Sequence, residues 1–157
     1  MAALDELSGI FSEKLCEGGS VTFSPRGASM LPMLRAYGDS VTLTAPPARL
    51  KKGMVALFVL NKEDGGVKYI LHRLVKIKKS GLVFCGDHRL ECDPEVSPEA
   101  VVGVLSSYRS RGKERSIKSL TYRLYSFFMV HTTRIRKLAL KAENLAYRVW
   151  KGLRGGK

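Results

Sequence analysis

A β-hairpin is predicted by residues 53–77, which read GMVALFVLNKEDGGVKYILHRLVKI. Gly53 opens an apolar run, Met54 to Leu60, whose length and composition suit a buried strand. Asp64-Gly65 then gives a strong hairpin-turn signal. Val67 to Lys78 has the β-branched and aromatic content of a long strand. The stretch therefore points to a mainly β fold.

Shorter strand signals lie on both sides of this hairpin. Each is a brief run of β-branched or apolar residues next to a turn-forming residue: Val21–Phe23, Ser40–Thr44, Leu82–Cys85 and Ala100–Ser107. Residues 86–98 show no periodicity and are expected to form a loop. The chain between the two ends should thus be one β domain.

Helical spacing of apolar residues appears only at the two ends of the chain. A short amphipathic helix is expected near residues 3–16, and one long basic helix or two shorter ones from Ser116 to Leu153. In the C-terminal segment one predicted apolar stripe consists of Leu120, Leu124, Phe127 and Phe128. We expect three parts: an amphipathic helix (1–18), a β domain (19–107) and a basic helical tail (108–157).

The net charge of +13 is concentrated in that tail. From Tyr108 onward there are 14 Lys and Arg residues against Glu114 and Glu143, whereas the two signs almost cancel before it. A basic amphipathic helix can lie on anionic lipid, with Phe127, Phe128 and Trp150 entering the interface. Two alternatives stay open. The helices could simply pack on the β domain, or they could bind nucleic acid, which is less favoured because no recognition motif is present.

Composition also limits the other classes of protein. The three cysteines, Cys16, Cys85 and Cys92, have no metal-ligand spacing and form no disulfide framework, so we expect no metal or cofactor. No apolar run approaches the roughly 20 residues of a membrane span. The N-terminus lacks the pattern of a secretory signal. We expect a cytoplasmic protein, or one held peripherally at the inner face of a membrane.

Short motifs follow one another in a set order between residues 21 and 106. They are Gly27-Ala28-Ser29-Met30-Leu31-Pro32, Gly38-Asp39, the strand led by Gly53, His72-Arg73, Gly86-Asp87 and Val101-Val102-Gly103. No single motif is decisive, but the ordered series resembles the signal peptidase I superfamily of serine peptidases. Within that superfamily, a histidine followed by Arg at the base position resembles the archaeal and endoplasmic-reticulum type.

The resemblance implies a role for each matching residue. Ser29 corresponds to the nucleophile and His72, which precedes Arg73, to the general base. In the histidine type an aspartate six residues after the Gly-Asp motif completes the set, and here Asp93 stands six residues after Asp87. Asp93 is therefore the predicted orienting carboxylate, with Asp87 as the alternative and Arg73 as a supporting residue.

Elementary chemistry agrees with these assignments. A serine hydroxyl needs a base to become a good nucleophile, and histidine suits that role near neutral pH. A carboxylate behind it selects the tautomer, and the backbone N–H of Ser29 is the simplest oxyanion donor. Some relatives add a hydroxyl two residues before the nucleophile, where this chain has Gly27.

Simpler interpretations exist for each of these residues. Ser29 could be an ordinary turn residue, His72 a surface residue of a strand, and Asp93, before Pro94, a turn former. Strand alternation places Lys68 on the same face as His72, which makes it a weak rival base.

The resemblance implies a small, bent, barrel-like β domain and an endopeptidase acting through an acyl-enzyme. Its expected substrate is a leader or signal-like segment of a peptide or protein precursor, bound as an extended strand with small residues before the cut. Typical members carry a membrane anchor before the nucleophile, which this sequence lacks, so exported preproteins are not the expected substrate. Two alternatives are a non-catalytic peptide-binding module and, less favoured because the base position is His72, a self-cleaving repressor-like domain.

Overall fold

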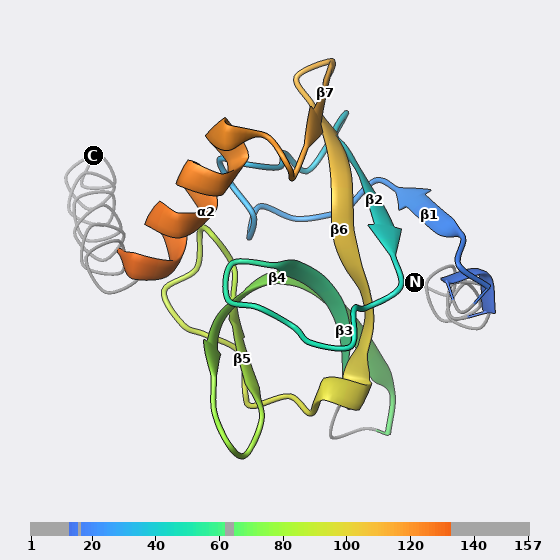
Figure 1. Ribbon diagram of the computed structural model, residues 1–157, viewed down its shortest axis with the longest axis vertical. Helices are drawn as coiled ribbons and strands as arrows, with labels where there is room; N and C mark the ends of the chain where they lie inside the picture. Colours follow the sequence, from blue (N-terminus) through green and yellow to red (C-terminus); the bar gives the residue numbers. More distant parts are fainter. Residues whose placement is uncertain (1–12, 16, 62–64, 133–157) are drawn as a thin grey trace, which may run out of the picture.

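The protein folds into one antiparallel sheet of seven strands (Figure 1). The structure is a computed structural model that describes residues 13–15, 17–61 and 65–132. The strand order is β1-β2-β6-β3-β4-β5, with β7 paired to β6. The sheet is not closed, because β1 and β5 lie at opposite ends of this order. The strands are β1 (Ser20–Phe23), β2 (Ser40–Thr44), β3 (Val55–Asn61), β4 (Val67–Ile77), β5 (Leu82–Cys85), β6 (Val101–Ser110) and β7 (Lys113–Ser116). The predicted mainly β class is confirmed.

Strand β3 is covered on both faces, which explains its nearly continuous apolar sequence. Val55 and Leu57 of β3 enter one hydrophobic cluster, and Ala56 and Phe58 enter a second. Successive side chains of a strand point to opposite faces, so a strand buried on both faces cannot alternate apolar with polar residues. Strand β3 pairs with both β6 and β4, so the hairpin lies in the middle of the sheet.

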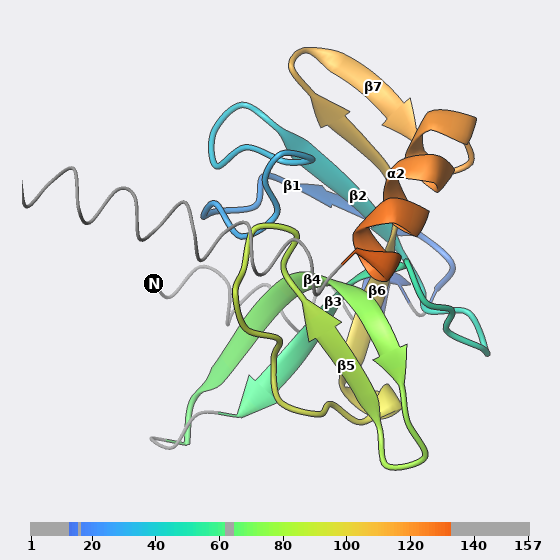
Figure 2. The same cartoon turned by 90° about the vertical axis from the view of Figure 1, so that its left-hand side faces the viewer.

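Strand β6 connects the two ends of the sheet. Its first half pairs with β3 and its second half with β2, and both pairings contain a register shift. Figure 2 shows the end with β1, β2 and β7 turned away from the end with β3, β4 and β5. Such irregularities bend a sheet locally, because an extra residue on one strand increases its twist.

The predicted end of the β domain at Ser107 is wrong. Strand β6 continues to Ser110, and the unpredicted β7 pairs back onto it, so residues 108–116 belong to the sheet and not to the helical tail. The turn between them, Arg111-Gly112, has positive φ at both residues (55° and 75°), as tight hairpin turns require. Strand β7 reads KERS and is exposed throughout, so it lacks the apolar alternation by which strands are found.

The described helical elements are few. Residues 13–15 are helical, and the rest of the predicted helix 3–16 lies outside the described residues. A 3-10 turn, η2 (Pro98–Ala100), precedes β6. Helix α2 (Leu120–His131) falls within the predicted C-terminal helical span and begins at Ser119, whose side chain accepts a hydrogen bond from the Tyr122 N–H. Residues 133–157 lie outside the described part. No helix among the described residues is long and apolar enough to cross a membrane.

Helix α2 turns its predicted apolar stripe outward. The side chains of Leu120, Leu124, Phe127 and Phe128 are 69%, 61%, 62% and 64% exposed. The buried residues of the helix are Tyr122, Ser126 and Met129, which face the sheet. The helix therefore packs on the sheet through Tyr122, Ser126 and Met129, and not through its apolar stripe.

Candidate active site

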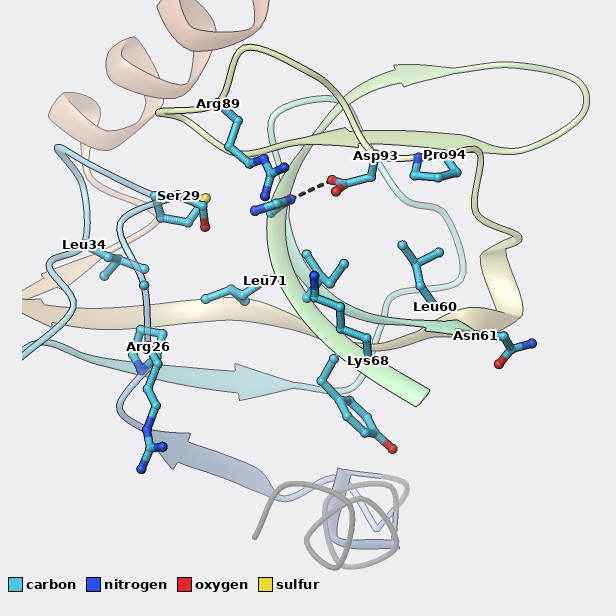
Figure 3. Close-up of a pocket in the computed structure, with 16 residues that line it drawn as sticks. Arg26, Ser29, Leu34, Leu60, Asn61, Lys68, Leu71, Arg89, Asp93 and Pro94 are labelled. Atoms are coloured by element: carbon cyan, nitrogen blue, oxygen red, sulfur yellow. Dashed lines mark hydrogen bonds and ion pairs between the residues drawn. The ribbon is translucent and has the colours of Figure 1, made fainter. Parts of the chain in front are cut away.

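A cleft of about 380 Å³ runs along the edge of β4 (Figure 3). Its lining includes Ser29, His72 and Asp93, which come from a loop after β1, from β4 and from the loop after β5. The structure thus brings the three predicted catalytic residues to one cavity. Its volume falls within the usual range of ligand pockets, about 300–1,000 Å³.

His72 and Asp93 are in direct contact. The Nδ1 atom of His72 lies 2.6 Å from Oδ2 of Asp93, and their side chains are only 3% and 9% exposed. The backbone fixes both partners: His72 is paired with Ala56 across the hairpin, and the Asp93 N–H donates to the Phe84 carbonyl of β5. A carboxylate bound at Nδ1 leaves the Nε2 lone pair as the basic site of the neutral ring.

Ser29 is held in place by its backbone. Its carbonyl accepts a 2.8 Å hydrogen bond from the His88 N–H. A Cβ atom added to Gly86 would lie 2.6 Å from that same carbonyl oxygen, so only glycine allows this approach. The Gly86-Asp87 turn therefore supports the loop that carries Ser29. Gly27, two residues before Ser29, is exposed and adopts a φ of 94°, which shapes the turn before Ser29.

Ser29 and His72 line the same cleft. Among the hydrogen bonds of the described residues, none joins the Ser29 hydroxyl to His72. The side chain of His88 is exposed and Lys68 lines the cleft farther along β4. Catalytic hydrogen bonds are often long before substrate binds, and a rotation of the Ser29 side chain is a small motion.

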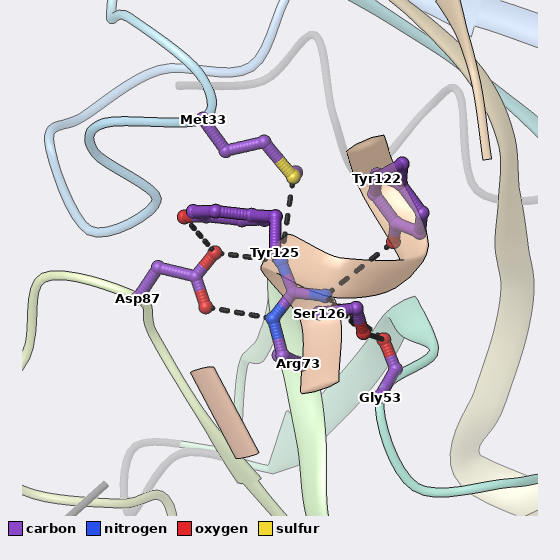
Figure 4. Close-up of polar contacts among 7 residues, drawn as sticks. All are labelled: Met33, Gly53, Arg73, Asp87, Tyr122, Tyr125 and Ser126. Atoms are coloured by element: carbon purple, nitrogen blue, oxygen red, sulfur yellow. Dashed lines mark hydrogen bonds and ion pairs between the residues drawn. The ribbon is translucent and has the colours of Figure 1, made fainter. Parts of the chain in front are cut away.

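Asp87, the alternative partner for His72, binds Arg73 instead (Figure 4). Arg73 Nε and Nη2 donate to the two carboxylate oxygens of Asp87 at 2.8 and 2.7 Å. Both side chains are buried. Burial by itself would lower the pKa of Arg73, but the bonds to Asp87 outweigh it and hold that pKa above its ordinary value. Asp87 thus belongs to a structural ion pair.

Helix α2 completes the surroundings of Arg73. Arg73 Nη1 donates to the Ser126 hydroxyl at 3.0 Å and to the Gly53 carbonyl at 2.9 Å. The Tyr125 hydroxyl donates to Asp87 at 2.9 Å, and the guanidinium lies over the rings of Tyr122 and Tyr125. Every part of this group is thus satisfied by protein atoms, as a buried charge requires.

These residues of α2 were missed by sequence reasoning. Tyr122, Tyr125 and Ser126 follow one another at helical spacing, which is the only local signal that they share a face. Nothing in the sequence relates them to Arg73, about fifty positions away along the chain. Their location depends on how α2 packs.

Asp39, from the other Gly-Asp motif, is also a structural residue. It accepts hydrogen bonds from the Arg35 N–H, the Arg35 guanidinium, the Ser110 hydroxyl and the Arg111 N–H. Desolvation would raise the pKa of this buried carboxyl, but the hydrogen bonds, led by those from Arg35, hold it well below the usual value. Asp39 ties the β1–β2 loop to the β6–β7 turn.

Comparisons with known proteins leave the family open. No family model matches the chain, and searches of the curated proteins and of the solved structures found no match. The resemblance to signal peptidase I therefore depends on the order and identity of the motifs quoted above.

Proposed function

We propose that this chain is a serine endopeptidase in which Ser29 is the nucleophile, His72 the general base and Asp93 the carboxylate that orients His72. The observation that carries the proposal is the 2.6 Å contact between His72 and Asp93, inside a cleft that Ser29 also lines. A buried carboxylate at Nδ1 selects the tautomer that a base needs and stabilises the imidazolium formed during the reaction.

The reaction follows from these positions. Ser29 Oγ bonds to the scissile carbonyl carbon while its proton passes to His72 Nε2, and the Ser29 N–H stabilises the oxyanion. The C–N bond then breaks and His72 returns the proton to the leaving amine. Water next attacks the acyl-enzyme ester, giving its proton to His72, which restores the Ser29 hydroxyl as the acid leaves.

The edge of β4 supports binding of an extended substrate. Strand β5 pairs only with residues Arg73 to Ile77 of β4, so within the described structure residues 67–71 have a partner on one edge alone. Leu74 directs its N–H and C=O toward β3. By the alternation of an antiparallel ladder, Tyr69 and Leu71 direct theirs toward the open edge. A peptide strand could pair there, beside the cleft.

Three finer expectations belong to the same proposal. The scaffold would be the bent, barrel-like domain of the histidine type of signal peptidase, and the substrate would be a leader or signal-like segment of a precursor. The protein would act in the cytoplasm, either free or held peripherally at the inner face of a membrane. The outward apolar stripe of α2 and the positive charge of the tail support this last point.

A non-catalytic peptide-binding module is the second candidate. It is favoured by one observation: in the described residues the Ser29 hydroxyl and His72 are not hydrogen-bonded to each other. A cleft that binds peptides without this contact would hold them without cutting them.

A peptide library separates the two candidates. Purified protein is incubated with mixed peptides at neutral pH, and cut sites are read by mass spectrometry. We expect wild type to cleave, and Ser29→Ala and His72→Ala to lose at least about 10³-fold in rate. Ser24→Ala, in the same loop, and His88→Ala, with an exposed side chain, are the matched controls. Equal cleavage by wild type and Ser29→Ala would overturn the assignment, and binding without cleavage would favour the module.

A further inference from the structure

Cationic side chains surround the candidate catalytic cleft. Its lining includes Arg26, Lys68 and Arg89, while Asp93 is the only carboxylate among the described residues that line it. Asp93 is already bound to His72 at 2.6 Å. A substrate entering the cleft therefore meets positive charge that no other carboxylate among the described lining residues balances.

Over residues 1–107 as a whole, by contrast, basic and acidic residues almost cancel, with 13 Lys and Arg against 12 Asp and Glu. Elsewhere in the domain some cations have acidic partners, in the pairs Arg35–Asp39, Arg73–Asp87 and Lys78–Glu95, whereas exposed ones such as Lys79 take part in no ion pair of the described residues. Across the described parts of the chain, no ion pair involves Arg26, Lys68 or Arg89. A concave surface of one sign concentrates ligands of the opposite charge.

The three cations occupy different positions along the cleft. Figure 3 shows Arg89 close to Asp93 at the catalytic end, Lys68 farther along β4, and Arg26 on the segment after β1 with its guanidinium directed toward β1. Lys68 shares a strand face with His72 and is four residues away, or roughly 13 Å at 3.3 Å per residue. An extended peptide paired with the edge of β4 would span this interval with about four residues.

We propose that the cleft selects peptide segments with acidic side chains, one beside the scissile bond facing Arg89 and another about four residues away facing Lys68, with Arg26 adding to the attraction. This inference depends on the proposed function for the position of the scissile bond, but the charge preference itself does not. The recognised chemistry is a carboxylate on an extended chain.

The test uses three matched pools of fluorescein-labelled dodecapeptides that share randomised small residues and differ only in two fixed positions four apart. These positions hold Glu, Gln or Lys. We expect cleavage of the Glu pool to exceed that of the Gln pool by about two- to five-fold per charge, and the Lys pool to be poorest. Raising the ionic strength should narrow the difference, because salt screens exposed charges.

Substitutions of the lining cations show which of them carry the preference for acidic peptides. Lys68→Gln and Arg89→Gln should each remove part of it, and Lys68→Glu should turn it toward the Lys pool. Lys79→Gln, an exposed cation outside the cleft, is the control and should change nothing. Equal cleavage of the three pools by active wild type would overturn the inference and leave the peptidase assignment intact.

A binding measurement keeps the two proposals distinguishable. Fluorescence anisotropy of the same pools with Ser29→Ala protein reports affinity without hydrolysis. If wild type cuts no pool but the Glu pool still binds tightest, the charge preference stands and the peptidase assignment fails. If no pool binds in preference to another, the inference is wrong.

Discussion

His72 and Arg73 are neighbours on β4, yet they face two very different surroundings. His72 lines an open cleft, where its Nδ1 atom contacts Asp93. Arg73 points to a closed interior, where its bonds to Asp87, Gly53, Ser126 and Tyr122 satisfy it. Adjacent side chains of a strand lie on opposite faces, so one strand serves both purposes.

The two faces of β4 thus serve different purposes: the His72 side lines the cleft, and the Arg73 side is fully bonded within the protein. In the proposed reaction His72 is the base, and a base must keep one ring nitrogen available to the substrate. A buried cation must lose none of its partners, because an unpaired buried charge is costly. The bonds of Arg73 hold β4 in place, and this fixes where His72 lies in the cleft. Two predictions test this division, and two smaller ones concern Asp39 and the outward face of α2.

The largest effect should come from Asp93→Asn on the open side. The amide cannot hold His72 in the reactive tautomer, so we expect kcat to fall by at least about 10²-fold, with the thermal midpoint nearly unchanged. Initial rates on a cleaved library peptide measure it, and calorimetry checks the fold. The matched control is Glu91→Gln, because Glu91 is an exposed carboxylate in the same loop. Asp87→Asn is unsuitable as a control because it should destabilise the domain. A rate within two-fold of wild type would exclude Asp93 from the reaction.

Asp87→Asn on the closed side should act mainly on stability. It leaves the buried Arg73 guanidinium without its counter-charge, and we expect a loss of about 3–5 kcal/mol in the free energy of unfolding. Urea denaturation measures this. Tyr125→Phe removes a single hydrogen bond to the same carboxylate and should cost only about 0.5–1.5 kcal/mol. Equal losses for both would mean that the ion pair is not what holds this side together.

Asp39 is another fully hydrogen-bonded carboxylate, and its contribution to stability should depend on pH. Its folded-state pKa is lowered, so it contributes stability above the unfolded value of about 3.9, and this is lost as pH falls toward the lowered pKa. We expect Asp39→Asn to be less stable than wild type at pH 7 and to converge with it in acid. Unfolding curves at neutral pH and below about pH 4 test this. A constant gap between the two proteins would contradict it.

The smallest effect on stability should come from the outward stripe of α2. Leu124→Ser with Phe128→Ser alters exposed side chains, so the free energy of unfolding should change by less than about 0.5 kcal/mol each. Binding to vesicles that contain anionic phosphatidylglycerol should fall, while binding to neutral phosphatidylcholine should stay weak. Ile77→Ser, another exposed apolar residue, is the control. Unchanged vesicle binding would argue that the stripe contacts a protein or another part of this chain.

Local sequence predicts much of the sheet and little of its surroundings. The strands from Val21 to Cys85 could be predicted because apolar and β-branched runs end at glycine and proline turns. Strand β7 could not, since its charged residues pair through backbone bonds that carry no side-chain signal. The stripe of α2 was found, but its outward direction was not, because a helical pattern shows which residues share a face and not which face packs.

The candidate site divides in the same way. Ser29, His72 and the six-residue spacing from Asp87 to Asp93 could be found in the sequence, because short motifs keep these residues at set positions along the chain. Which aspartate contacts His72 was decided by the fold: β5 and its loop return Asp93 to the cleft and leave Asp87 beneath α2. The sequence by itself determined the chemical groups and the strands that carry them. Tertiary structure decided their partners, because contacts between distant residues depend on packing and strand register, which no local pattern encodes.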